Sequence, residues 1–78
     1  MNERALPGQG EKWRHFKNKE YKILAVAVHT ETDEQLVVYQ ALYGENRIYA
    51  RPIEMFMSEV DKKKYPDSQQ KWRFEKVK

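Results

Sequence analysis

Apolar and polar side chains alternate along several short stretches of the chain, and this period of two residues is typical of β-strands. Residues 20–29 carry apolar side chains on both parities, a pattern that predicts a central strand of a closed sheet. Residues 12–16 predict a partner strand, because Asn18 between the two runs tolerates the left-handed backbone of a tight turn. The first predicted unit is therefore strand, turn, strand.

A second hairpin is predicted further along the chain. Residues 35–43 are strongly β-prone and place Tyr39 and Tyr43 on the parity opposite the leucines. A Gly-Glu-Asn turn follows, and residues 47–51 form the return strand. We expect Tyr49 on this return strand to lie near Tyr43 or Tyr39.

The last third of the sequence contains less regular structure. Pro52 has no backbone N–H, so it ends the preceding strand, and residues 53–57 fit a single helical or 3₁₀ turn. Residues 61–70 form a polar linker, and residues 71–77 form a final strand. Five or six short strands without a long amphipathic helix predict an all-β fold, a small antiparallel barrel or roll.

The length of 78 residues, of which 40% are hydrophobic, allows one small domain with a modest core. Residues 1–10 combine Pro7 and two glycines with little apolar content, so we expect a flexible N-terminal lead before a single domain at residues 11–78. Such a domain has no room for a deep substrate cavity, and any ligand is expected in a shallow groove.

The composition also indicates a compartment. The chain has no cysteine, which excludes disulfides, thiolate nucleophiles and cysteine-based metal sites and suits a reducing cytoplasm. No apolar run approaches the ~20 residues that cross a bilayer, and the first ten residues lack the apolar core of an export signal. We therefore expect a cytoplasmic protein without a membrane span.

Positive charge is concentrated in two separate segments. Residues 12–22 and residues 61–78 each carry a net charge of +4, whereas residues 23–60 carry −4. If the first and last strands are neighbours in the sheet, these basic segments combine into one positive face. The candidate basic patch consists of Lys12, Lys62, Lys63, Lys64, Lys71 and Arg73. The alternative is that the run of three lysines is simply a solvated turn.

Four blocks of sequence carry a family resemblance. In order, they are Trp-Arg-His-Phe-Lys at residues 13–17, Val-Ala-Val-His-Thr-Glu-Thr at 26–32, Val-Val-Tyr with Leu-Tyr-Gly at 37–39 and 42–44, and Arg-Pro with Met-Phe at 51–52 and 55–56. The chain resembles the bacterial domain-of-unknown-function family 1653 over residues 11–60, and Arg73-Phe74 also matches the last strand of that family. The resemblance implies a small SH3-like β-barrel or roll and implies no particular activity.

Aromatic and arginine side chains on the predicted strands form the first candidate ligand surface. Arg14, Tyr39, Tyr43, Tyr49 and Arg51 lie on strands whose parity can expose them together. Aromatic rings on a small barrel stack nucleic-acid bases or hold an extended peptide. The alternative is that Tyr39 and Tyr43 complete the core.

A second candidate cluster contains both histidines. His29 and Glu31 stand two residues apart, and His15 on a neighbouring strand would add a second imidazole. Such a set would bind a metal ion or act as a general acid and base, but His-x-Glu at a strand end is equally typical of a structural histidine. We expect no metal, no cofactor and no catalytic residue, and we keep the three residues as candidates for ligand binding.

The sequence therefore predicts a non-catalytic binding module, with a monomer favoured. The leading partner is a protein or peptide bound through the tyrosine and arginine surface. A single-stranded nucleic acid bound through the basic strands is the alternative, and a metal-dependent or His/Glu-dependent enzyme comes third.

Overall fold

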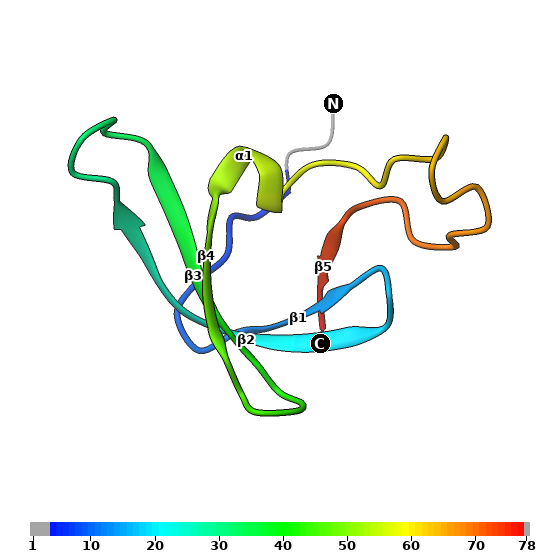
Figure 1. Cartoon of the computed structure of the whole chain (residues 1–78), viewed down its shortest axis with the longest axis horizontal. Coiled ribbons are helices and arrows are strands. Elements are labelled where there is room, and N and C mark those ends of the chain that lie inside the picture. Colours follow the sequence, from blue (N-terminus) through cyan, green and yellow to red (C-terminus); the bar gives the residue numbers. More distant parts are fainter. Residues whose placement is uncertain (1–3, 78) are drawn as a thin grey trace.

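The computed structural model describes residues 4–77 and contains one antiparallel sheet with the strand order β4-β3-β2-β1-β5 (Figure 1). The elements are β1 (Lys12–His15), β2 (Lys19–Val28), β3 (Gln35–Ala41), β4 (Ile48–Pro52), the short helix α1 (Ile53–Phe56) and β5 (Phe74–Lys76). The all-β class, the two hairpins and the single helical turn are confirmed. The helix α1 is too short to cross a membrane, and no other helix occurs among residues 4–77.

The left-handed turn predicted between the first two strands is present. Asn18 has φ of +68° and donates its backbone N–H to the carbonyl oxygen of His15 at 2.8 Å. An asparagine side chain tolerates this region far better than a branched one does. The turn therefore brings the end of β1 directly against the start of β2.

The prediction of a closed sheet is wrong, because β4 and β5 remain as two separate edges. The strand β2 bends at an irregularity between Ile23 and Ala25, so β3 and β4 run steeply across β1 and β2 in Figure 1. At Pro52 the strand β4 loses a backbone donor and gives way to α1, while β5 is only three residues long. Among residues 4–77, no hydrogen-bonded ladder joins these two edges.

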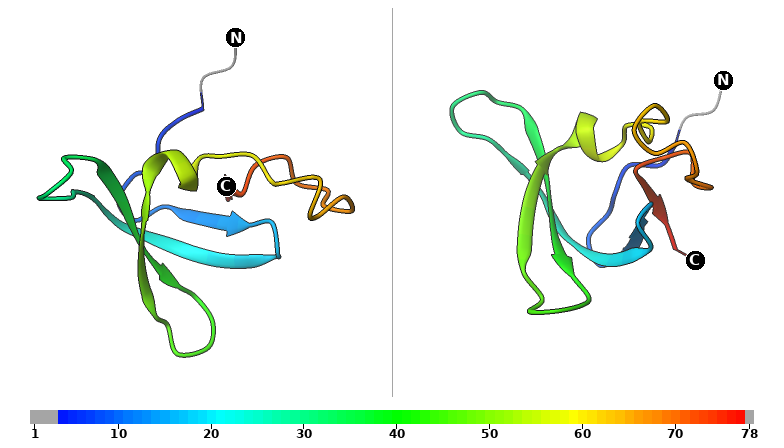
Figure 2. Two further views of the ribbon diagram at one scale, coloured as in Figure 1. Left: turned by 45° about the horizontal axis from the view of Figure 1, so that its top comes forward. Right: turned by 45° about the vertical axis from the view of Figure 1, so that its right-hand side comes forward.

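The first and last strands are neighbours, which is the condition under which the two basic segments would combine. Trp13 pairs with Lys76 and His15 pairs with Phe74, and the segment that returns from α1 to β5 extends beyond the sheet in both views of Figure 2. This pairing places the two basic segments of the sequence side by side. The topology thus supplies the condition for a shared positive region.

The core is largely aromatic. Its buried members are Trp13, Tyr21, Ile23, Val37, Tyr39, Ala41, Phe56 and Phe74. The helix α1 contributes Phe56, whose ring stacks on Phe74 with centroids 4.0 Å apart and planes at 8°. The helix thus joins the two edges of the sheet by packing between them, which takes the place of hydrogen-bonded closure.

Residues 4–10 contact the domain more closely than the expected flexible lead. The Arg4 guanidinium donates to the carbonyl oxygens of Met57 at 2.9 Å and Phe74 at 2.5 Å, and it lies 4.2 Å from the ring centroid of Trp72. Pro7 is buried. Residues 1–3 of the expected lead lie outside the described residues.

Candidate functional site

A concave site lies where the β1–β2 turn meets β4 and the segment before β5. We call it the cationic pocket. Its volume is about 320 Å³, and it is lined by His15, Phe16, Lys17, Arg51, Asp61, Lys64, Tyr65 and Arg73. Four cationic side chains and one carboxylate leave a formal charge of +3 at neutral pH, with the histidine neutral. The arrangement favours an anionic ligand.

Backbone hydrogen bonds bring the lining residues together from three parts of the chain. Phe16 donates its N–H to the carbonyl oxygen of Arg73 at 3.0 Å, which holds the β1–β2 turn against the start of the last strand. The Asp61 carboxylate accepts from the backbone N–H of Lys63 at 3.0 Å and of Lys64 at 3.4 Å. This turn, typical of aspartate, places Lys64 and Tyr65 at the pocket.

The two arginines of the cationic pocket are each fixed by one hydrogen bond. Arg51 Nε donates to the Tyr39 hydroxyl at 3.2 Å, and Arg73 Nε donates to Ser58 Oγ at 3.1 Å. Among residues 4–77, the terminal nitrogens of these guanidiniums have no hydrogen-bond partner, and the four pocket cations form no ion pair. The guanidinium groups are therefore oriented while their terminal N–H groups remain free for a ligand.

His15 is held in one orientation at the wall of the cationic pocket. Its Nδ1 accepts the backbone N–H of Lys17 at 3.1 Å, so the neutral ring carries its proton on Nε2. Burial, and then the positive charges of Arg51, Arg73 and Lys17, lower the pKa of His15 to about 4. His15 is therefore neutral at physiological pH and offers one uncharged donor.

The predicted tyrosine surface is largely internal, and of the two alternatives for Tyr39 the structure has the one in the core. Tyr39 is 4% exposed, because the face of β3 that carries it is the core face. Tyr43 and Tyr49 are 38% and 40% exposed and surround Tyr21, whose hydroxyl lies 2.5 Å from that of Tyr43. Burial, followed by this hydrogen bond, raises the pKa of Tyr21. The tyrosines form a packed cluster, with open ring area at its margin alone.

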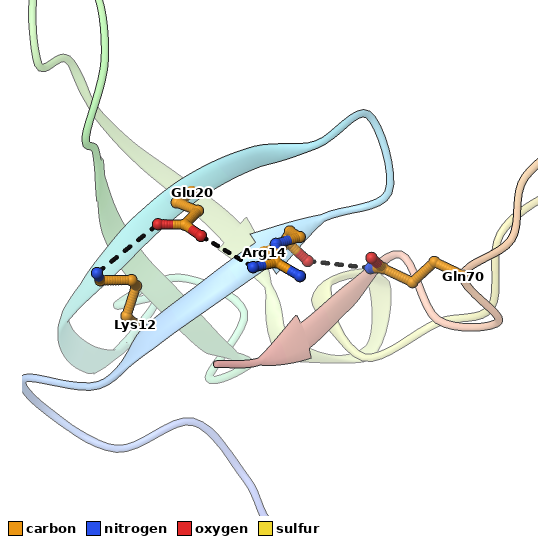
Figure 3. Close-up of polar contacts among 4 residues, drawn as sticks. All are labelled: Lys12, Arg14, Glu20 and Gln70. Carbon is orange, nitrogen blue, oxygen red and sulfur yellow. Dashed lines mark hydrogen bonds and ion pairs between the residues drawn. The ribbon is translucent and has the colours of Figure 1, made fainter. Parts of the chain in front are cut away.

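Arg14 and Lys12 lie on β1 and are engaged outside the cationic pocket (Figure 3). Arg14 pairs with the Glu20 carboxylate at 3.1 Å and Lys12 with the same carboxylate at 3.7 Å. The Gln70 amide also donates to the backbone oxygen of Arg14 at 3.0 Å. Glu20 thus partly neutralises two of the predicted binding residues.

The predicted basic patch is divided by the structure. Lys64 and Arg73 line the cationic pocket, whereas Lys62 Nζ donates to the carbonyl oxygen of Ser68 at 2.6 Å. Lys71 lies with its ammonium 5.0 Å from the ring centroid of Trp72. Lys63 is exposed and does not line this pocket.

His29 and Glu31 meet through the backbone of the turn between β2 and β3. His29 Nδ1 accepts the backbone N–H groups of Glu31 at 3.1 Å and Thr32 at 3.3 Å. No group of three or more potential metal-ligating side chains occurs in the part of the chain that the structure describes. The arrangement is that of a histidine that stabilises a turn.

Four residues of the cationic pocket were not among the predicted site residues: Phe16, Lys17, Asp61 and Tyr65. Phe16 and Lys17 belong to the β1–β2 turn, and Asp61 and Tyr65 belong to the predicted polar linker. The signal that pointed to this region was the pairing of two basic segments, since one segment contributes Lys17 and the other contributes Lys64 and Arg73. Arg51 comes from the acidic middle of the chain, so the charge pattern of the sequence did not indicate that it would line this pocket.

Two comparisons place the chain among known proteins. The model of a family described as protein of unknown function (DUF1653) matches residues 11–76. The crystal structure of a DUF1653 protein from Bordetella bronchiseptica is similar, with 29% sequence identity, a TM-score of 0.72, and coverage of 90% of this chain and 87% of the other. No curated protein matches the sequence.

Proposed function

Since this chain belongs to the DUF1653 family, a family of unknown function, we propose from its own geometry that it is a non-catalytic binding module whose cationic pocket takes an anionic group of a partner. The observation that carries the proposal is the set of four cations in one concave site that have no ion-pair partner among residues 4–77. Neighbouring like charges repel one another, and an anion relieves that repulsion.

The fixed arginines add geometric selectivity. A guanidinium that is already oriented loses less side-chain entropy on binding a carboxylate or phosphate than a free one does. Arg51 and Arg73 are both held through Nε, so each offers its terminal N–H groups. His15, held through Nδ1 by the backbone N–H of Lys17, adds an uncharged N–H donor at Nε2 beside these cations, which supports binding of an anion.

A protein or peptide is the partner that we propose first. A small SH3-like roll, the architecture that we propose for this open sheet, offers shallow grooves suited to extended chains. A single-stranded nucleic acid is the second candidate, because the pairing of β1 with β5 brings two basic segments together. A phosphate backbone needs several cations in a row, however, and Lys12, Arg14 and Lys62 are engaged within the domain.

The proposal is tested by titrating inorganic phosphate into ¹⁵N-labelled protein at low salt and following the ¹⁵N–¹H correlation spectrum. We expect shifts centred on His15, Lys17, Lys64 and Arg73, all of which line the cationic pocket. Arg51→Gln is expected to weaken phosphate binding by about tenfold, because a charge-assisted hydrogen bond contributes roughly 1.5–3 kcal/mol.

Arg14→Gln is the matched control, since it removes the same charge from an arginine that is paired with Glu20 outside the pocket. It should leave phosphate binding nearly unchanged. Equal weakening by Arg14→Gln and Arg51→Gln, or shifts spread evenly over the surface lysines, would mean that net charge alone attracts the anion and that the pocket is not a site.

A further inference from the structure

A second pocket adjoins the cationic pocket and shares a wall with it. This apolar pocket, also of about 320 Å³, is lined by Phe16, Lys17, Lys64, Tyr65, Pro66, Asp67 and Ser68. Four of these residues line both pockets, and the exposed lining of the apolar pocket is mainly non-polar. One ligand that fills both sites must therefore present an anionic group and an apolar group close together.

The shared wall is a compact cluster of aromatic and lysine side chains. The rings of Phe16 and Tyr65 meet edge to face, with centroids 4.8 Å apart. The ammonium groups of Lys17 and Lys64 lie 5.2 Å and 5.7 Å from the Tyr65 ring centroid. Both ammonium groups thus lie over the Tyr65 ring, in the wall that the two pockets share.

This geometry discriminates between an apolar side chain and a nucleic-acid base. A base gains its affinity by stacking face to face on an open aromatic ring. The Tyr65 ring carries two lysine ammoniums near it, and the Phe16 ring lies against His15 with centroids 4.5 Å apart and planes tilted by 30°. The apolar pocket is better suited to the edge and sides of a peptide side chain.

Resting on the proposed function, we infer that the partner is a peptide segment in which an acidic side chain stands next to an aromatic or large aliphatic one. The carboxylate occupies the cationic pocket between Arg51 and Arg73, and the apolar side chain occupies the neighbouring pocket beside Phe16, Tyr65 and Pro66. Charge complementarity sets the first contact, and burial of the apolar side chain provides the additional affinity.

The test compares capped peptides that differ at one type of side chain. The first probe is acetyl-Gly-Phe-Glu-Phe-Gly-amide, in which phenylalanine flanks the acid on both sides and so makes the result independent of chain direction. The second has both phenylalanines replaced by alanine, and the third has glutamine in place of glutamate. Binding to the full chain is followed by ¹⁵N–¹H correlation spectra, with inorganic phosphate and a short oligothymidylate as further probes.

We expect the Glu-to-Gln change in the peptide to abolish shifts in the cationic pocket. The Phe-to-Ala change should weaken binding by about tenfold, because partial burial of one ring contributes on the order of 1.4 kcal/mol. In the Tyr65→Ala protein the two acidic peptides should bind equally, since the apolar pocket has lost part of its wall. The peptide comparison with the unaltered protein decides the question even if this variant is unstable.

The outcomes separate this inference from the proposed function. Shifts with phosphate, but equal affinity for the Phe and Ala peptides, would refute the acidic–apolar motif and leave the anion site in place. The absence of any response to phosphate or to the acidic peptides would refute both. Tighter binding of oligothymidylate than of the Phe peptide would replace the peptide partner with a single-stranded nucleic acid.

Discussion

Lowering the pH from 7 to 5 should destabilise this domain through His15. His15 has an ordinary pKa of 6.5 when the chain is unfolded and a pKa of about 4 in the folded domain. As the pH falls below 6.5, the unfolded chain takes up a proton that the folded domain does not. The contribution of His15 to the free energy of unfolding is therefore fully present above pH 6.5 and is lost as the pH falls toward 4.

The magnitude follows from these two pKa values. Their difference corresponds to at most about 3.4 kcal/mol. Because His15 is only half-buried, solvent screening reduces this to about 1–2 kcal/mol. Roughly half of that is lost between pH 7 and pH 5, which lowers the melting temperature by about 3–6 °C in a domain of this size.

The assay is thermal unfolding of the wild type, His15→Gln and His29→Gln at pH 7 and pH 5. His15→Gln should lower the melting temperature at both pH values but remove most of the difference between them. His29→Gln removes the other imidazole, which lies in the β2–β3 turn, and measures how much of the pH dependence arises outside the cationic pocket. An unchanged pH dependence in His15→Gln would refute the assignment of the effect to this ring.

Three further predictions concern the fold. Phe56→Ala should lower the free energy of unfolding by about 3–5 kcal/mol, because it breaks the stack on Phe74, and circular dichroism should show a largely unfolded domain. Phe56→Leu should remain folded. Equal losses of stability in the two variants would contradict the packing role of this ring. Asn18 has φ of +68°, so in denaturant titrations Asn18→Gly should change the unfolding free energy by less than about 0.5 kcal/mol, whereas Asn18→Val should lower it by about 1–2 kcal/mol. A Val variant as stable as the wild type would contradict the left-handed turn. Arg4→Gln should cost about 1–2 kcal/mol through its lost contacts with Trp72 and two carbonyl oxygens, and no change in the denaturation midpoint would show that this arginine does not stabilise the domain.

The strands and turns were predictable because they depend on local patterns. An apolar run on both parities located β2, a β-prone run located β3, and Asn18 and Pro52 marked a turn and a strand end through their backbone properties alone. Closure of the sheet was not predictable in this way. It depends on whether two edges far apart in sequence meet, and the apolar run of β2 is equally consistent with a closed and an open sheet.

The face on which each tyrosine lies shows a second limit. Parity placed Tyr39 opposite the leucines of β3, but parity does not state which face is covered. The helix α1 covers the tyrosine face through Phe56, whose ring centroid lies 5.3 Å from that of Tyr39. Tyr39, a candidate for the exposed surface, is therefore a core residue, whereas Tyr43 and Tyr49 remain partly exposed.

The all-β class, the order of the hairpins, the family and the concentration of positive charge in two segments could all be predicted from the sequence, since each depends on neighbouring residues or on a linear match. Which charges act together depends on the folded arrangement of the strands. The pairing of β1 with β5 brings the turn that carries Lys17 close to Arg73, and Arg51 from β4 lines the same pocket. Arg14 is instead paired with Glu20 on β2. Electrostatic interactions depend on distance in space. Arg14 and Arg51 were both predicted to bind a ligand, but in the folded chain only Arg51 lines the cationic pocket, whereas Arg14 is paired with Glu20.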